Sequence, residues 1–343
     1  MPIDFHTHIL PGIDDGSRNV EMSLRMLAAQ REQQVDEIVA TPHFYAQKDS
    51  VEEFLLRRQC SYEKLKTKMA ETNLDQKLHL AAEVYYFQGI GSAGMIPKLC
   101  VEGTQTLLLE MPIDFHTHIL PGIDDGSRNV EMSLRMLAAQ REQQVDEIVA
   151  TPHFYAQKDS VEEFLLRRQC SYEKLKTKMA ETNLDQKLHL AAEVYYFQGI
   201  GSAGMIPKLC VEGTQTLLLE MPFAQWDSAI YADVEKLVRH QKLKVVLAHI
   251  ERYYEFQKKK EIWDAVMELP LYRQMNAGVF LNWKKRHKAF QLAKEATTII
   301  LGSDCHNMDT RHPNLAEGRI VLVKKFGEAF IQRTDCLTRE VLQ

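Results

Sequence analysis

The chain has 343 residues, of which 45% are hydrophobic and 26% are charged, and its formal net charge is −5. This is the composition of a globular protein that can bury a sizeable core, and the mild negative charge excludes the basic footprint of a nucleic-acid-binding protein. No apolar run approaches the roughly 20 residues that span a membrane. The N-terminal MPIDFHTHILPG lacks the basic start and apolar core of a signal peptide, so we expect a cytoplasmic protein.

The chain opens on a perfect internal repeat, because residues 1–110 recur without a change as residues 111–220. A period of 110 residues is too long for a solenoid unit, so the identity indicates either a very recent duplication or an error in the gene sequence. Removing one 110-residue copy from 343 residues leaves 233, which suits one compact domain. Residues 221–343 continue directly from the second copy. Because connections within domains are short, we predict a complete domain at 111–343 and a non-catalytic half-domain at 1–110.

Short apolar runs alternate with amphipathic stretches from residue 113 onward. The predicted strands are residues 113–120, 147–151, 188–196, 216–221, 244–250, 278–282 and 297–304, and the predicted helices are residues 130–143, 160–181 and 229–241, with more helix after Pro313. Ser160 and Glu163 form the S-x-x-E pattern of a capping box, which predicts a helix start. Strands that alternate with helices indicate a parallel sheet, and this number of strands indicates a closed or nearly closed barrel with its site at the carboxyl ends of the strands.

Histidines and carboxylates gather where these strands end. His116 and His118 end the first strand, and Asp304 and His306 end the last. Residues two apart in a strand point to the same side, so each pair faces one site. Single residues at the other strand ends or in the next loop complete the set: Asp124, Asp125, His153, Glu193, Glu220 and His249. Imidazoles suit zinc, manganese and iron, and carboxylates let several cations share a site, so the pattern predicts a metal centre.

Six motifs occur in order along residues 111–343: HTHILPGIDDGS, ATPHF, AAEVYY, LLLEMP, AHIERY and SDCHNMDTR. They resemble the motifs of PHP-type (polymerase and histidinol phosphatase superfamily) tyrosine phosphatases of bacterial capsule and exopolysaccharide operons. The resemblance implies an α/β fold, a distorted seven-stranded (β/α) barrel, which is preceded here by an identical duplicate of its N-terminal half.

The same resemblance implies a centre of three divalent ions, usually manganese, with zinc or iron as alternatives. One ion would be held by His116, His118, Glu193 and Asp304, the second by Glu193, Glu220 and His249, and the third by Asp125, His153 and His306. Arg252 and Arg311 match the family's phosphate-binding arginines. Their planar forks suit phosphate oxygens.

The function implied by the resemblance is metal-dependent hydrolysis of phosphotyrosine on a protein, namely a bacterial tyrosine kinase that controls polysaccharide synthesis. A small-molecule phosphatase, such as histidinol phosphatase, shares the barrel and the ligands and remains an alternative. The duplication leaves a further alternative open, a non-catalytic binding protein in which the extra half-barrel occludes the site. The open strand edges of residues 1–110 also allow association with another chain into a homo-oligomer.

Residues 305–311 form a competing motif, because Cys305 and Arg311 satisfy the C-x5-R pattern of cysteine-based tyrosine phosphatases. That mechanism needs a thiolate in a loop of backbone amides, which usually contains glycine. This stretch has no glycine, and strand alternation points Cys305 away from Asp304 and His306. We therefore expect a metal mechanism and not a cysteine nucleophile.

Overall fold

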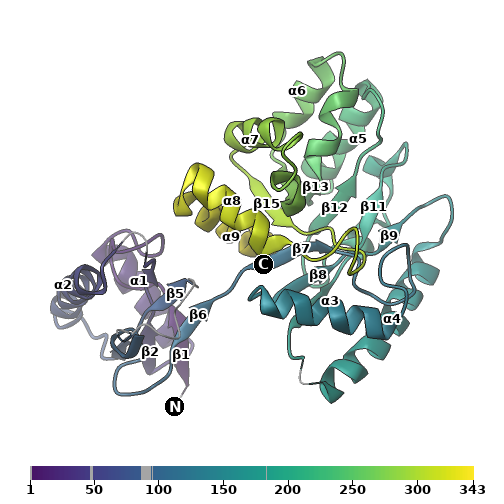
Figure 1. Cartoon of the computed structure of the whole chain (residues 1–343). Helices are drawn as coiled ribbons and strands as arrows, with labels where there is room; N and C mark the ends of the chain where they lie inside the picture. Colours follow the sequence, from purple (N-terminus) through teal and green to yellow (C-terminus); the bar gives the residue numbers. More distant parts are fainter. Residues whose placement is uncertain (1, 47–48, 86–93, 95, 183) are drawn as a thin grey trace. The chain divides into compact units, whose positions relative to one another are not determined.

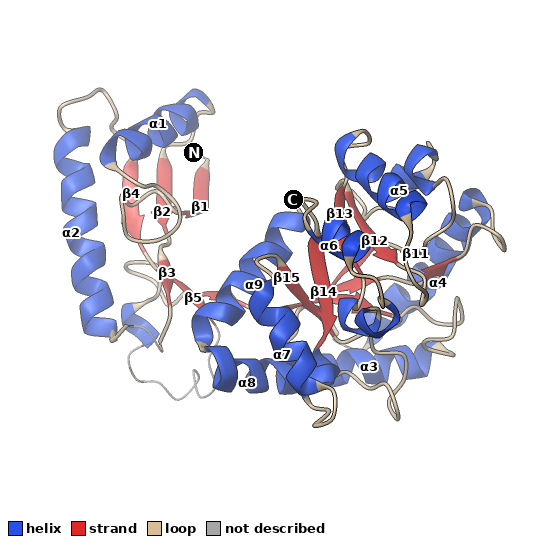
Figure 2. Ribbon diagram, turned by 90° about the horizontal axis from the view of Figure 1, so that it is seen from above, coloured by secondary structure: helices blue, strands red, loops and turns tan. Residues whose placement is uncertain are grey.

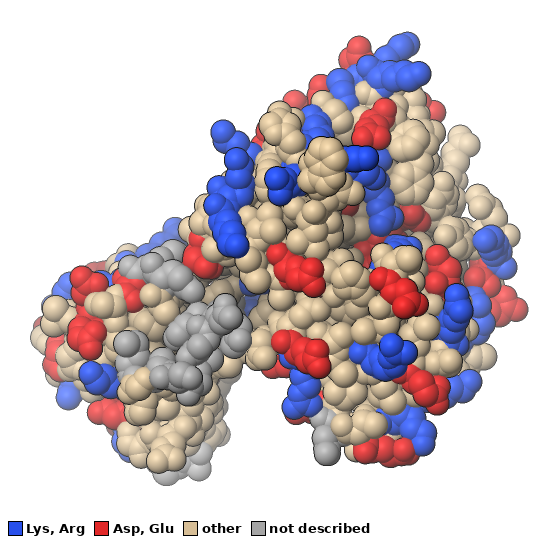
Figure 3. Space-filling model, in the orientation of Figure 1, with Lys and Arg blue, Asp and Glu red and all other residues tan. Residues whose placement is uncertain are grey.

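The computed structural model describes residues 2–46, 49–85, 94, 96–182 and 184–343 (Figure 1). The chain divides into two compact units, Met1–Met111 and Pro112–Gln343. No helix among the described residues is both long and apolar enough to cross a membrane. Basic and acidic side chains are interspersed over the face drawn in Figure 3, in keeping with the small net charge of −5.

The second unit is built from parallel strands with helices around them (Figure 2). Its strands are β7 (Ile113–Thr117), β8 (Glu147–Ala150), β9 (His153–Phe154), β10 (Lys187–Leu190), β11 (Glu193–Tyr195), β12 (Thr216–Glu220), β13 (Lys244–Leu247), β14 (Tyr272–Asn276) and β15 (Ile299–Gly302). Its α-helices are α3 (Val130–Glu142), α4 (Val161–Glu181), α5 (Ser228–Arg239), α6 (Glu261–Met267), α7 (Arg286–Glu295), α8 (Leu315–Phe326) and α9 (Glu328–Val341). The alternation of strands and helices therefore gives the expected α/β fold.

The strands pair in two sheets, in the orders β10-β8-β7 and β15-β14-β13-β12-β11-β9. Backbone hydrogen bonds continue across the short gaps between β8 and β9 and between β10 and β11, from Ala191 N to Ala150 O (2.9 Å) and from Glu193 N to Pro152 O (3.0 Å). Each interrupted pair, β8 with β9 and β10 with β11, therefore occupies one strand position. A single strand or such a pair is called a stave below. The segment that follows β15, the last stave, is hydrogen-bonded to β7, the first stave, because Asp304 N donates to His116 O at 2.8 Å.

Apolar side chains fill the interior between the strands. One group of buried residues comprises Ile113, Phe115, Val149, Ala191, Val211, Leu218, Val246, Ala248, Ile300 and Val341. Helix starts are set locally, because the Ser160 side chain accepts from Glu163 N and the Asn129 side chain accepts from Met132 N. This confirms the helix start that the S-x-x-E pattern predicted. The strands are buried at nearly every position, as expected of a parallel sheet covered on both faces.

Two predicted strands are wrong in detail. Residues 278–282 are not a strand: the 3₁₀ helix η7 (Ala277–Phe280) lies there, and Phe280 packs on Phe290 at a ring separation of 5.7 Å. The strand is β14, which hydropathy misses because its sequence YRQMN carries polar residues that serve the site. Residues 188–196 form two short strands rather than one, since β10 ends before Ala191-Ala192 and β11 begins after them.

The first unit repeats the start of the second. It contains β1 (Ile3–Thr7), α1 (Val20–Glu32), β2 (Glu37–Ala40), β3 (His43–Phe44), α2 (Val51–Met69), β4 (Lys77–Leu80), β5 (Glu83–Tyr85) and β6 (Leu108–Glu110). Its sheets have the orders β1-β2-β4 and β3-β5-β6, which are the pairings of the corresponding strands in the second unit. Identical residues differ in burial, however: Phe5 is 47% exposed and Phe115 is fully buried. The first unit therefore lacks the half that covers this face.

Candidate metal centre

All nine side chains expected to bind metal lie together at the carboxyl ends of the strands of the second unit. Their nitrogen and oxygen atoms form a chain of close contacts that runs from His116 and His118 through Glu193 to the remaining members. The full set is His116, His118, Asp125, His153, Glu193, Glu220, His249, Asp304 and His306. The parallel order of the strands brings these residues from distant parts of the sequence to one rim.

Four of these side chains form a group, here called the cage, in which two imidazole nitrogens each face two carboxylates. His116 Nε2 and His118 Nε2 lie 3.2 Å apart, and each lies 3.2 Å from Glu193 Oε2. Asp304 Oδ1 lies 3.6 Å and 3.5 Å from the same two nitrogens. Ligand atoms at roughly 2.0–2.2 Å from one ion are separated from one another by about 3.0–3.6 Å, so the cage has the size of a metal site.

A second group surrounds the other oxygen of Glu193. His249 Nε2 lies 2.9 Å from Glu193 Oε1 and 3.6 Å from Glu220 Oε1. Because its two oxygens face different groups, Glu193 can bridge two ions, as the resemblance implies.

A third group lies around Asp125. Asp125 Oδ1 is 3.5 Å from both His153 Nε2 and His306 Nε2. His153 also turns Nδ1 toward Glu193 Oε2 at 3.0 Å and Glu220 Oε2 at 3.8 Å. Both nitrogens of His153 therefore face possible ligands, and the geometry is compatible with placing this ring in the second group or in the third.

Several buried polar atoms of the cluster lack a hydrogen bond within the described part of the chain. They are Glu193 Oε2, His153 Nδ1, His249 Nδ1 and His306 Nε2. A buried polar atom without a partner costs about 1–3 kcal/mol, and more for a charged group. Glu193 Oε2 and His306 Nε2 each face other candidate ligand atoms at 3.0–3.5 Å, where a cation would give them a partner, so the residues present fit a metal.

The pKa shifts hold two of the clustered imidazoles in the neutral form that binds metal. Burial lowers the pKa of His249 to about 4, and burial together with the charge of His118 lowers that of His306 to about 2. These imidazoles are thus neutral, with lone pairs free for a metal. Burial and the negative charge of Glu193 raise the pKa of Glu220 to about 8. Burial opposes a positive charge on His118, but Asp124 and Glu193 raise its pKa to about 10, so this place favours a proton or a metal ion.

Further side chains orient the cluster without joining it. Asp124 Oδ2 lies 2.7 Å from His118 Nδ1, which turns Nε2 toward the cage. Gln274 Oε1 lies 3.1 Å from His116 Nδ1 and accepts from His249 N at 2.6 Å. Asn276 Nδ2 donates to Asp304 Oδ2 at 2.7 Å. Such hydrogen bonds fix ring orientation and tautomer in metal sites.

Gln274 and Asn276 were not predicted from the sequence, although both lie on β14. The signal that could have found them is their spacing of two in the polar run YRQMN, which places both side chains on the site face of the strand.

Backbone strain marks two of the candidate ligands. His249 has φ +29° and Asp304 has φ +53°, a region that residues other than glycine seldom adopt. Residues held there cost of order 1–3 kcal/mol each and concentrate at functional sites. The loop after β7 is tight as well, because a Cβ on Gly126 would lie 2.3 Å from His118 O. The fold therefore places these side chains at a local energetic cost.

The two predicted arginines converge on Asp304. Arg252 Nη2 contacts Asp304 Oδ2, and Arg311 Nη2 lies 2.6 Å from Asp304 Oδ1. Their side chains are 36% and 35% exposed, so both guanidinium groups lie at the solvent-exposed opening of the cluster, which is called its mouth below. Phe223 is 40% exposed, and its ring lies nearly parallel to that of His249 at 6.0 Å. The mouth is therefore both cationic and aromatic.

Cys305 is outside this arrangement. It is fully buried, its Sγ accepts from Gln140 Nε2 at 3.6 Å, and burial raises the pKa of its thiol well above the usual value. A thiol that stays protonated inside the protein is not a nucleophile. The C-x5-R pattern is thus coincidental, as expected.

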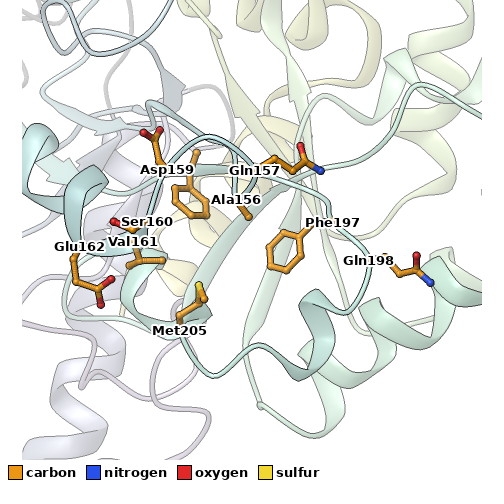
Figure 4. A pocket seen from close by; sticks show the side chains of 10 residues that line it. Ala156, Gln157, Asp159, Ser160, Val161, Glu162, Phe197, Gln198 and Met205 are labelled. Atoms are coloured by element: carbon orange, nitrogen blue, oxygen red, sulfur yellow. The ribbon is translucent and has the colours of Figure 1, made fainter.

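A separate hollow of about 600 Å³ lies beside the cluster, in the loops that follow β9 and β11. Figure 4 shows Ser160, Val161 and Glu162 from the start of α4 and Phe197, Gln198 and Met205 from the segment after β11 around it. Phe154, which also lines it, directly follows His153. The hollow combines apolar walls with a few polar groups, as binding pockets do.

The first unit carries an incomplete copy of the cluster. His6 Nε2 and His8 Nε2 lie 3.0 Å and 3.2 Å from Glu83 Oε2, and His43 Nε2 lies 3.4 Å from Asp15 Oδ1. The side chain of His6 is 48% exposed, whereas that of its counterpart His116 is fully buried. The repeat has no counterparts of His249, Asp304 and His306, which all come from residues 221–343.

A parallel α/β fold with histidines and carboxylates clustered at its strand ends defines an α/β protein with a candidate metal centre. The chain belongs to the capsular polysaccharide synthesis CpsB/CapC family, whose pattern it matches twice, over residues 2–111 and 112–339.

The chain is similar to tyrosine-protein phosphatases of this group. It is 27% identical over 230 residues to the tyrosine-protein phosphatase CpsB of Streptococcus agalactiae serotype III (strain NEM316), which covers 63% of this chain and 91% of that one. It is 28% identical over 227 residues to the tyrosine-protein phosphatase YwqE of Bacillus subtilis (strain 168), covering 63% and 85%. One chain from the solved structures of YwqE from Bacillus subtilis and CpsB from Streptococcus pneumoniae, described as metal-dependent tyrosine phosphatases, gives a TM-score of 0.56 at 24% identity, covering 64% of this chain and 89% of that chain. That structural likeness shows a shared fold.

Proposed function

We propose that residues 111–343 form a metal-dependent protein-tyrosine phosphatase. The observation that carries this proposal is the cage of His116, His118, Glu193 and Asp304, in which the two imidazole nitrogens lie 3.2 Å from each other and 3.2–3.6 Å from the carboxylate oxygens. Membership of the CpsB/CapC family and similarity to tyrosine-protein phosphatases over 63% of the chain support it.

We propose a centre of three divalent ions, manganese in the first instance, with zinc or iron as alternatives. The nine clustered side chains would hold them, with Glu193 as a bridge. Bound there, the ions supply positive charge for the dianionic phosphate and lower the pKa of a water molecule enough to ionise it near neutral pH. The protein holds the ligands in place beforehand, through Asp124, Gln274 and Asn276.

We assign Arg252 and Arg311 to phosphate binding. Both guanidinium groups contact Asp304 and are about one-third exposed, so they can reach a phosphate at the mouth while staying close to the ligands. Their N–H groups donate to phosphate oxygens, and charge that develops during transfer meets donors that are already oriented. Phe223 offers a flat face beside His249 on which the phenyl ring of phosphotyrosine can stack.

We propose that the substrate is a phosphotyrosine segment of a protein, in this family context a bacterial tyrosine kinase that regulates capsule or exopolysaccharide synthesis. The hollow beside the cluster, with Phe154, Phe197 and Met205 in its wall, would take a side chain that flanks the phosphotyrosine. The cytoplasmic location belongs to the same proposal.

For the fold, we propose the PHP-type distorted seven-stranded barrel for 111–343, with β8/β9 and β10/β11 each counted as one stave. The strand orders and the hydrogen bond from Asp304 N to His116 O support this proposal. We further propose that residues 1–110 are catalytically silent, because the repeat supplies only part of the ligand set.

The function is tested by measuring phosphate release from a phosphotyrosine peptide and from histidinol phosphate with metal-loaded and chelated protein. We expect turnover of the peptide that disappears on chelation and returns with manganese. Asp304→Ala removes a cage ligand and should lower the rate by orders of magnitude, whereas Cys305→Ser should retain most activity. Activity of chelated protein together with an inactive Cys305→Ser variant would overturn the proposal, and preference for histidinol phosphate would replace the proposed substrate.

A further inference from the structure

We propose that the first units of two chains associate with each other through their open strand edges, β6 of one chain beside β1 of the other, to close an eight-stave barrel. The partner is thus a second copy of this chain, and the interface is the barrel interior that residues 221–343 cover in the second unit. The pairing is independent of the phosphatase activity, and only the test that excludes exchange of residues 221–343 rests on the proposed function.

The evidence is the different burial of identical residues in the two units. Ile3 and Phe5 are 54% and 47% exposed, while their counterparts Ile113 and Phe115 are 4% and 0% exposed. Ile113 and Phe115 belong to the interior cluster that Val246, Ala248, Ile300 and Val341 complete. All four of these come from residues 221–343, of which the chain has one copy. The exposed pair therefore marks an interior face that lacks its other half.

An exposed residue of helix α2 provides the internal comparison. Leu56 is 67% exposed, and its counterpart Leu166 is 66% exposed. Its exposure is the same in both units, so it reflects an outer helix surface rather than a missing partner. The interior pair thus changes burial between the two units, whereas this outer position does not.

The same face ends in two open strand edges. In the second unit the counterpart of β1 receives Asp304 N at His116 O, and the counterpart of β6 receives Ala248 N at Leu219 O. Among the described residues of the first unit, backbone hydrogen bonds from Ala81 N to Ala40 O and from Glu83 N to Pro42 O join the two sheets, which leaves β1 and β6 as the outermost strands. Unpaired backbone groups on an edge template association with another strand, and closure into a barrel removes both edges.

The number of copies of each half-barrel in the chain decides which partner covers the open face of the first unit. Each chain has two copies of residues 1–110 and one copy of 221–343. If the first unit of one chain took residues 221–343 from another chain, the second unit of that other chain would lose its covering half. The total apolar area exposed to water would then be unchanged. Pairing two first units covers both open faces at once, so this arrangement lowers the free energy of the system where exchange does not.

Symmetry makes the pairing geometrically possible. The first unit has four staves: β1, β2 with β3, β4 with β5, and β6. A twofold axis along the barrel brings β6 beside the β1 of the other chain twice and keeps all strands parallel. Two sets of four give eight staves, the number at which parallel (β/α) barrels commonly close.

Sedimentation equilibrium of the full metal-loaded chain tests the proposal. We expect a monomer–dimer equilibrium that Phe5→Asp and Ile3→Asp each weaken, on the order of tenfold to a hundredfold, because each puts a charge at a buried apolar contact. Leu56→Asp, on the outer surface, should leave the dimer unchanged, and circular dichroism should show that all variants stay folded. A wild-type monomer, or equal weakening by Leu56→Asp, would overturn the proposal.

The competing exchange arrangement is distinguished in the same samples by phosphatase activity. Exchange would let the first unit, with intact His8, form a complete barrel, so a His118→Ala chain would gain activity as its concentration rises. The proposed pairing predicts that His118→Ala stays inactive at every concentration while it still dimerises. Concentration-dependent activity of His118→Ala would therefore refute the pairing of first units.

Discussion

Truncation of one phenylalanine in each copy shows which copy completes the barrel. Phe115 is fully buried among Ile113, Leu218 and Ile300, whereas Phe5, the same residue of the repeat, is 47% exposed. Replacing a buried phenylalanine with alanine costs about 3–5 kcal/mol, from lost burial and from the cavity left behind. Phe115→Ala should therefore lower the free energy of unfolding of the second unit by about this amount.

Tryptophan fluorescence can follow the second unit alone, because the three tryptophans of the chain, Trp226, Trp263 and Trp283, all lie outside the repeat. Trp226 and Trp263 are buried, with rings 5.2 Å apart, and should change emission on unfolding. With a slope of about 3 kcal/mol per molar urea, typical of the upper range, a loss of about 3–5 kcal/mol moves the midpoint by about 1–1.7 M.

Phe5→Ala is the matched control, and it should leave the tryptophan transition where it is. Both variants carry the same chemical change in the same local sequence, so only the covering half differs. If Phe5→Ala moved the midpoint and Phe115→Ala did not, residues 1–110 would complete the barrel and the assignment of the active domain to 111–343 would be reversed. Equal shifts would mean that both copies share residues 221–343 in a mixed population.

Three further predictions concern the site. In assays of phosphotyrosine-peptide hydrolysis, His118→Ala should abolish activity and His8→Ala should preserve it, since only His118 lies in the complete cage; an inactive His8→Ala variant would contradict this. Arg252→Ala and Arg311→Ala should each lower kcat, on the order of tenfold or more, without changing the metal content measured by elemental analysis, because a lost transition-state contact slows the reaction at saturating substrate; unchanged kcat in both would remove these arginines from the site. Phe223→Ala should raise KM for phosphotyrosine peptide several-fold, by roughly 0.5–1.5 kcal/mol of lost stacking, but not for an alkyl phosphate; an equal rise for both substrates would show that the ring does not stack on the substrate.

Much of the candidate site was accessible from the sequence, for a physical reason. Two-residue spacing puts His116 and His118, and likewise Asp304 and His306, on one side of a strand whatever the rest of the fold does. Parallel strands then bring their carboxyl ends to one rim, so residues nearly 200 positions apart in the sequence could be expected to meet. The helix start at Ser160 was equally local and followed from a side chain that binds an amide three residues on.

The errors in strand prediction arose where the hydropathy of a segment does not reflect whether it forms a strand. Hydropathy favoured residues 278–282 as a strand, yet the strand is β14, whose Gln274 is fully buried because it binds His116 and the backbone of His249. The break within 188–196 was also invisible to a pattern of apolar residues, since the gap consists of two alanines. Polar residues that serve a site look like loop residues until their partners are known.

What the sequence determined by itself is the set of chemical groups: which histidines, carboxylates and arginines exist, their local spacing along strands and the exact repeat of 110 residues. It could not determine how those groups are buried, because burial depends on elements far away in the chain. His6 and His116 have the same neighbours in sequence, yet one side chain is 48% exposed and the other is fully buried. Only the tertiary structure makes that difference, by placing β13, β14 and β15 against one copy, since removal from water needs a covering surface that no local pattern can supply.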